Sequence, residues 1–341
     1  MLTSLAYIFL LGLSLGYIFS KLKLPALLGM LFTGIILGPY VLNLLSPSIL
    51  SISADLRQLA LVIILTRAGL ALDLDDLKKV GRPAFLMCFV PACFEIAGMI
   101  LLAPTLLGIS VLEAALLGTV IAAVSPAVIV PKMLFLMENK IGTKKSIPQL
   151  IMAGASVDDV FVIVLFTAFT GLLSGGEVSA TSFIEIPVAI STGLATGVLF
   201  GLLLSVYFKR FHLRDSIKVL ILLSISFLFV ALEKQLKGIV PLSGLLAVMG
   251  MSATLLKTYR ILAQRLSAKF NKLWVGAEIL LFVLVGATVD IKYAVAAGFA
   301  AVLRIFGVLI FRLYKRQLVP FRLPWGYRAG RLCSLWRCLP S

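Results

Sequence analysis

Two adjacent aspartates, Asp158 and Asp159, lie inside the apolar run from Ile151 to Gly171. This run is long enough to cross a bilayer as a helix, and at about 1.5 Å per residue it places both carboxylates roughly 15 Å deep. Carboxylates at that depth cost free energy, and in membrane proteins they are typical of ion and proton pathways. The pair therefore predicts a site that binds a cation or a proton.

A second candidate element is the preceding apolar segment, which reads AAVSPAVIVPKM and contains Pro126 and Pro131. Each proline removes a backbone N–H donor and clashes with the carbonyl four residues earlier, so we expect the helix to break here. Broken backbone at membrane depth is tolerated where it lines a cavity or is buried in protein. The freed carbonyls and the Ser125 hydroxyl would then be oxygen ligands for a small cation, about halfway across the membrane like Asp158 and Asp159.

The composition shows what must position these residues. The chain is 61% hydrophobic and 13% charged, with a mean hydropathy of +1.10, which excludes a soluble domain and indicates an all-α polytopic membrane protein. We predict apolar segments of spanning length at eleven places, centred near Leu11, Phe32, Ile64, Pro91, Val124, Leu165, Thr196, Ser226, Val248, Leu281 and Val302.

Loop charge predicts the orientation. The loops after odd-numbered segments carry seventeen Lys or Arg, and the loops after even-numbered segments carry four. Because positively charged loops stay in the cytoplasm, we expect the N-terminus to lie outside a bacterial-type inner membrane. We interpret the first segment as a retained helix and not as a cleaved signal peptide. The bias in loop charge explains the net charge of +16 without a nucleic-acid partner. The four cysteines have no metal-ligand spacing with His212, and no cofactor is expected.

The spacing of glycine, proline and aspartate indicates an internal repeat. Pro25 precedes Gly34 by the same interval as Pro241 precedes Gly250, and the interval from Gly69 to Asp73 recurs from Gly286 to Asp290, as the printed sequence shows. The related segments, two with nine and three with ten, are an odd number apart, so each pair crosses the membrane in opposite directions. This pattern is typical of the inverted repeats of secondary transporters.

The end of the chain does not continue the repeat. In the second half of the repeat, the position equivalent to the aspartate pair would fall beyond Ser341. From Arg312 onward the chain holds seven Arg or Lys and no acid. We therefore divide it into a transmembrane domain, 1–312, with an incomplete second repeat, and a tail, 313–341. The tail is either a basic anchor on anionic lipid or, as we favour, the non-native product of a frameshift or gene fragment.

Four stretches resemble the sodium/proton exchangers of the cation:proton antiporter superfamily, over roughly residues 5 to 312. They are LPALLGMLFTGIILGP from Leu24, AAVSPAVIVPKM from Ala122, ASVDDVFVIVLF from Ala155 and FVLVGATVDI from Phe282. The aspartate pair after a proline-broken helix is the most specific of these.

The resemblance implies a thirteen-helix antiporter, of which about eleven helices are present, with a dimerisation domain and a mobile core domain. It implies that Asp159 carries the ion and the proton in competition, and that Asp158 is the neighbouring residue that is Asp in electrogenic members. The expected substrates are sodium, or lithium or potassium, and protons, in a homodimer within the lipid bilayer. The family's second broken helix with its membrane-embedded base is not found; Arg304 is the one remaining deep base that could replace it.

Other intramembrane charges favour a structural interpretation. Arg67, Glu95 and Glu278 each lie well inside a segment, and we interpret them as buried ion pairs, Arg67 with Glu95 or Glu278. Two further hypotheses stay open. One is an inactive truncated antiporter; the other is an intramembrane aspartyl protease, which is disfavoured because its two acids must approach from opposing segments.

Overall fold

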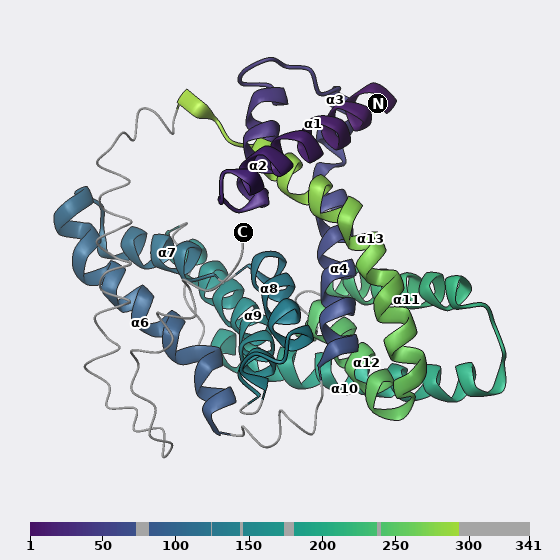
Figure 1. The fold of residues 1–341 in the computed structure, drawn as a ribbon. Helices are drawn as coiled ribbons and strands as arrows, with labels where there is room; N and C mark the ends of the chain where they lie inside the picture. The colour runs from purple at the N-terminus through teal and green to yellow at the C-terminus, as the bar shows by residue number, and fades with distance from the viewer. Residues whose placement is uncertain (73–81, 124, 144–145, 174–180, 237–239, 293–341) are drawn as a thin grey trace. The chain divides into compact units, whose positions relative to one another are not determined.

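The computed structural model describes residues 1–72, 82–123, 125–143, 146–173, 181–236 and 240–292. Within this part of the chain, the regular structure is entirely helical (Figure 1). The helices are α1 (Leu2–Lys21), α2 (Ala26–Leu37), α3 (Pro47–Ser51), α4 (Ser53–Ala71), α6 (Arg82–Leu107), α7 (Val111–Ala122), α8 (Pro126–Glu138), α9 (Ile147–Leu173), α10 (Thr181–Arg210), α11 (Asp215–Leu236), α12 (Gly244–Thr258) and α13 (Arg260–Ala287).

The helices agree with the predicted segments. Nine of the eleven predicted centres fall within a helix, the centre near Val124 falls at the gap between α7 and α8, and the centre near Val302 lies outside the described residues. By length and composition, five described spans could cross a membrane: Leu2–Lys21, Val111–Glu138, Pro187–Arg210, Asp215–Leu236 and Arg260–Ala287. Three shorter apolar helices accompany them. The chain is thus an all-α multi-pass membrane protein, as predicted.

The chain forms two compact units, residues 1–57 with 278–341 and residues 58–277. In the first unit, α1 crosses α2 at a point where glycine allows the backbones to touch. A Cβ added at Gly29 would lie 2.5 Å from the Leu15 carbonyl oxygen, and one added at Gly12 would lie 2.7 Å from Ile279 of α13. Small residues at crossings are the usual means by which apolar helices pack closely in lipid.

The second unit contains a group of four helices, α6, α7, α8 and α9, in which α9 packs against the other three (Figure 1). Its core includes Ala92 and Ile96 of α6, Ala122 of α7, and Val162 and Leu165 of α9. These apolar contacts hold α9, which carries both aspartates, beside the end of α7.

The same unit contains α10, α11 and α12, and α10 and α12 lie side by side (Figure 1). Gly193, Gly197 and Gly201 recur every fourth residue along α10. A Cβ added at these glycines would lie 2.6, 2.5 and 2.7 Å from carbonyl oxygens in or next to α12. The seam is therefore a close backbone contact with no room for side chains on this face of α10.

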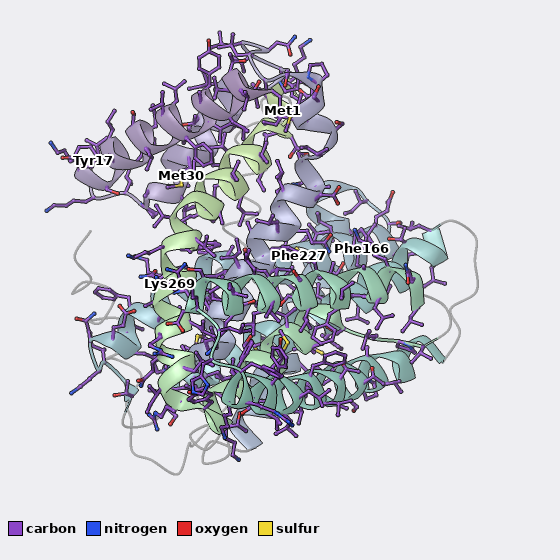
Figure 2. All side chains as sticks on the ribbon, turned by 90° about the vertical axis from the view of Figure 1, so that its right-hand side faces the viewer. Met1, Tyr17, Met30, Phe166, Phe227 and Lys269 are labelled. Carbon is purple, nitrogen blue, oxygen red and sulfur yellow. The ribbon has the colours of Figure 1, made fainter. Side chains whose placement is uncertain are left out.

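Large apolar side chains remain exposed along the helices, among them Phe227 of α11 and Phe166 of α9, which Figure 2 labels. A soluble protein rarely exposes so many, whereas a helix in a bilayer places such side chains against lipid.

Candidate functional site

The candidate site begins at the break between α7 and α8. The helix α7 ends at Ala122, and α8 begins at Pro126 with Ser125 as its N-cap residue. Ser125 is exposed and has extended backbone, with φ −68° and ψ 115°. Its hydroxyl makes no cap hydrogen bond, and its carbonyl oxygen accepts from the Val128 and Ile129 N–H groups. This helix end carries partial positive charge.

Proline explains where the break falls. Pro126 occupies the first turn of α8, where its missing N–H is not needed, and it disfavours helical backbone at Ser125. Pro131 has a different outcome, because α8 continues through it to Glu138. The expected interruption therefore lies before Pro126 alone, and Pro131 removes one hydrogen bond from a helix that is otherwise continuous.

The aspartates lie on α9, which is continuous from Ile147 to Leu173. The backbone at positions 158 and 159 is described, while their side chains lie outside the described part. On this helix, Val162, Leu165 and Phe169 form the stripe that faces the core with α6 and α7. Positions 158 and 159 are about 100° apart round the helix. The two residues thus occupy different faces of α9.

Arg67 and Glu95, which we expected to be structural, are buried, and Glu278 is half-buried. The Arg67 Nη2 atom lies 3.9 Å from the Glu138 Oε1 atom, at the end of α8. Sequence reasoning did not name Glu138 as a partner. The order of the predicted segments could have indicated this partner, because segments three and five are both odd-numbered and therefore end on the same side of the membrane.

Two predictions from the sequence concern residues that the structure does not describe. Arg304 and the tail, 313–341, lie beyond the described residues, so the replacement base and the nature of the tail stay predictions.

The comparisons with known proteins agree with the resemblance. Residues 6–330 match the family described as "Sodium/hydrogen exchanger, transmembrane". The chain belongs to the sodium/hydrogen exchanger family.

Curated exchangers align with parts of this exchanger-family chain. Sodium/hydrogen exchanger 9B2 of Homo sapiens is 36% identical over 188 residues, covering 55% of this chain and 35% of that protein. The 9B2 protein of Xenopus tropicalis is 34% identical over 197 residues, with shares of 55% and 36%. Sodium/hydrogen exchanger 9B1 of Mus musculus is 38% identical over 159 residues, with shares of 46% and 28%. The chain thus spans about a third of the length of these relatives.

A solved structure supports the fold. The sodium proton antiporter MjNhaP1 from Methanocaldococcus jannaschii superposes with a TM-score of 0.69 at 20% identity, covering 92% of this chain and 80% of that one. The exchanger-family chain therefore has the antiporter fold that the resemblance implied.

Proposed function

We propose that this chain is a secondary active antiporter that exchanges a monovalent cation, sodium in the first instance, for protons. The observation that carries the proposal is the packing of a broken helix, with its exposed Ser125, against the helix that carries Asp158 and Asp159. The family membership and the antiporter fold support it.

The lengths of α8 and α9 support a similar depth in the membrane for the helix break before Pro126 and for the two aspartates. The 13 residues of α8 correspond to about 20 Å of helix. Asp158 lies about 17 Å along α9 from the first residue of that helix, Ile147. Because α8 and α9 are joined by a short turn and pack together, the break and the aspartates lie at similar distances from that turn. This is the level at which a cation could meet carboxylate and backbone oxygens together.

The proposed chemistry is competition for one carboxylate. Asp159 binds either a sodium ion or a proton, and the carbonyls and hydroxyl at the break supply neutral oxygen ligands, as hard cations require. Since either occupant excludes the other, alternating access couples their opposite fluxes. Asp158, on a different face of α9, would carry a second charge and make the exchange electrogenic. The assignments of Asp159, Asp158 and Ser125 are part of this proposal.

The setting of the antiporter is proposed on the same grounds. The loop-charge bias favours an external N-terminus in a bacterial-type inner membrane, and the family resemblance favours a homodimer in the bilayer. Residues 1–312 would form the antiporter domain.

Proteoliposomes that contain the purified chain and an internal pH dye test the function. A sodium gradient should drive proton flux, and acidification should raise the apparent KM for sodium while leaving the maximal rate nearly constant. Asp159→Asn should abolish the flux, whereas Asp55→Asn, which removes an exposed acid from the first turn of α4, should not.

The same assay separates the alternatives. A chain that reconstitutes in folded form and gives no cation-driven flux with sodium, lithium or potassium would support the inactive truncated form. Cleavage of a membrane-embedded peptide, lost in Asp158→Asn and Asp159→Asn alike, would support the intramembrane protease.

A further inference from the structure

Basic side chains gather where α10 and α12 end and where α11 and α13 begin. We call this region the basic end and define it by Lys209, Arg210, Arg214, Lys218, Arg260 and Arg265. Two contacts hold the turns together. Lys209 Nζ lies 5.8 Å from the centroid of the Tyr259 ring, and Arg265 Nη2 lies 3.4 Å from Asp215 Oδ1. The basic end is thus one surface built by four helices.

Lys218 is the unusual member, because it is only 4% exposed. Its Nζ atom lies 5.5 Å from the centroid of the Phe208 ring. Within the described residues it forms no ion pair. The stem of Lys218 is enclosed by the protein, and one cation–π contact offsets the partial desolvation of its ammonium group only in part. An anion held at this place would supply the missing compensation.

The charge of the basic end is nearly uncompensated. In residues 207–218 and 257–272 the single acid is Asp215, and it is engaged by Arg265. Lys209 and Arg214 make no ion pair in the described part of the chain. The surface therefore favours a ligand with one or more negative charges.

The surroundings indicate the kind of anion. Below the basic end, α10 exposes a row of apolar side chains spaced by four residues, Val198, Leu202 and Val206. Beside it, the exposed rings of Tyr207 and Phe211 lie 4.8 Å apart. Aromatic side chains of this kind are enriched at the membrane–water interface. A phosphate beside an apolar row matches a lipid better than a soluble anion.

We propose that the basic end binds the phosphate of an anionic phospholipid, with Lys218, Lys209 and Arg214 around the headgroup and an acyl chain along the exposed row of α10. Loop charge that only sets topology requires no buried lysine and no contact between the turns. A bound lipid accounts for both, since basic residues at the ends of spanning helices attract anionic headgroups. Figure 2 labels Lys269, an exposed base further along α13 that extends the same positive region.

Thermal melts of the purified full chain in a neutral detergent test the proposal. Phosphatidylglycerol should raise the apparent Tm by about 3 °C or more, because a ligand that binds the folded state stabilises it. Phosphatidylcholine should leave the Tm unchanged. The double variant Lys209→Gln with Lys218→Gln should lose at least half of the phosphatidylglycerol shift.

A matched double variant distinguishes a site from diffuse charge. Lys23→Gln with Lys140→Gln removes the same two charges from exposed lysines in other turns, and it should keep the full shift. Equal shifts with both lipids, or equal losses in both double variants, would overturn the proposal. If the first double variant does not fold, Lys209→Gln alone should lose part of the shift and Lys218→Arg should keep it; the reverse result counts against the site. The melts require no transport activity, so they stand apart from the antiport assay.

Discussion

Gly34 of α2 and Gly286 of α13 lie back to back in the first unit. A Cβ added at Gly34 would collide with the Val283 carbonyl oxygen, and one added at Gly286 would collide with the Leu31 carbonyl oxygen and lie 3.1 Å from the Gly34 Cα atom. The two backbones are therefore in contact, and both glycines are required by space.

The second unit shows the related contact. A Cβ added at Gly69 of α4 would lie 2.5 Å from the carbonyl oxygen of Met249, the residue before Gly250 of α12. In the inverted repeat, α2 corresponds to α12 and α4 to α13. The repeat thus relates the pair of α2 with α13 to the pair of α12 with α4, and each pair is in contact within its own unit.

Replacing Gly34 by valine should destabilise the chain. The added side chain must displace the backbone of α13, and overpacking of this kind costs about 1–3 kcal/mol. Thermal melts in detergent measure the loss. Ala54→Val, at an exposed position at the start of α4, is the control and should melt like the parent chain. A Gly34→Val protein as stable as the Ala54→Val control would show that the contact is not tight.

Glu233 should stabilise the start of α12. Its Oε2 atom accepts a hydrogen bond from the Gly244 N–H at 3.1 Å, while the Ser243 hydroxyl accepts from the Leu246 N–H at 3.3 Å. A carboxylate at a helix N-terminus also interacts favourably with the helix dipole. Glu233→Ala should therefore cost about 1 kcal/mol, and Glu233→Gln should cost less because an amide oxygen can still accept. Melting curves of both variants, with Gln235→Ala as an exposed control on α11, test this order.

The pair of Arg67 and Glu138 should respond asymmetrically to mutation. The Glu138 side chain is 68% exposed and that of Arg67 only 10%. Glu138→Gln should change stability by less than about 1 kcal/mol, since solvent screens the ion pair. Arg67→Ala should cost more, because it also removes packing of the buried stem. A double-mutant cycle from melts gives the coupling, and a value well above 1 kcal/mol would contradict an exposed pair.

Asp158→Asn should change how exchange depends on the membrane potential. If Asp158 carries a second charge, its neutralisation removes one charge from each cycle, and a charge crossing the membrane is worth about 2.3 kcal/mol per 100 mV. Proteoliposomes with a potassium diffusion potential measure this effect. The variant should keep sodium-driven proton flux and lose its stimulation by voltage. Stimulation equal to that of the parent chain would assign the second charge elsewhere.

Much of the architecture could be predicted because hydropathy and proline act locally. Apolar length decides which residues cross the membrane, so nine predicted centres fall within helices. The proline rule predicted the gap before Pro126. The same rule predicted a break at Pro131, and there it was wrong, because α8 continues to Glu138. A helix that packs along its length can lose one hydrogen bond and continue.

The sequence by itself determined the spans and the repeated glycines, and it predicted the level of the aspartates. Only the tertiary structure decided which helices meet. It paired Arg67 with Glu138, placed Gly34 against Gly286, and brought Lys209 to Tyr259 across two turns. The physical reason is that spacing along a chain specifies the depth and the face of a residue, whereas its neighbour depends on how the faces of several helices pack together.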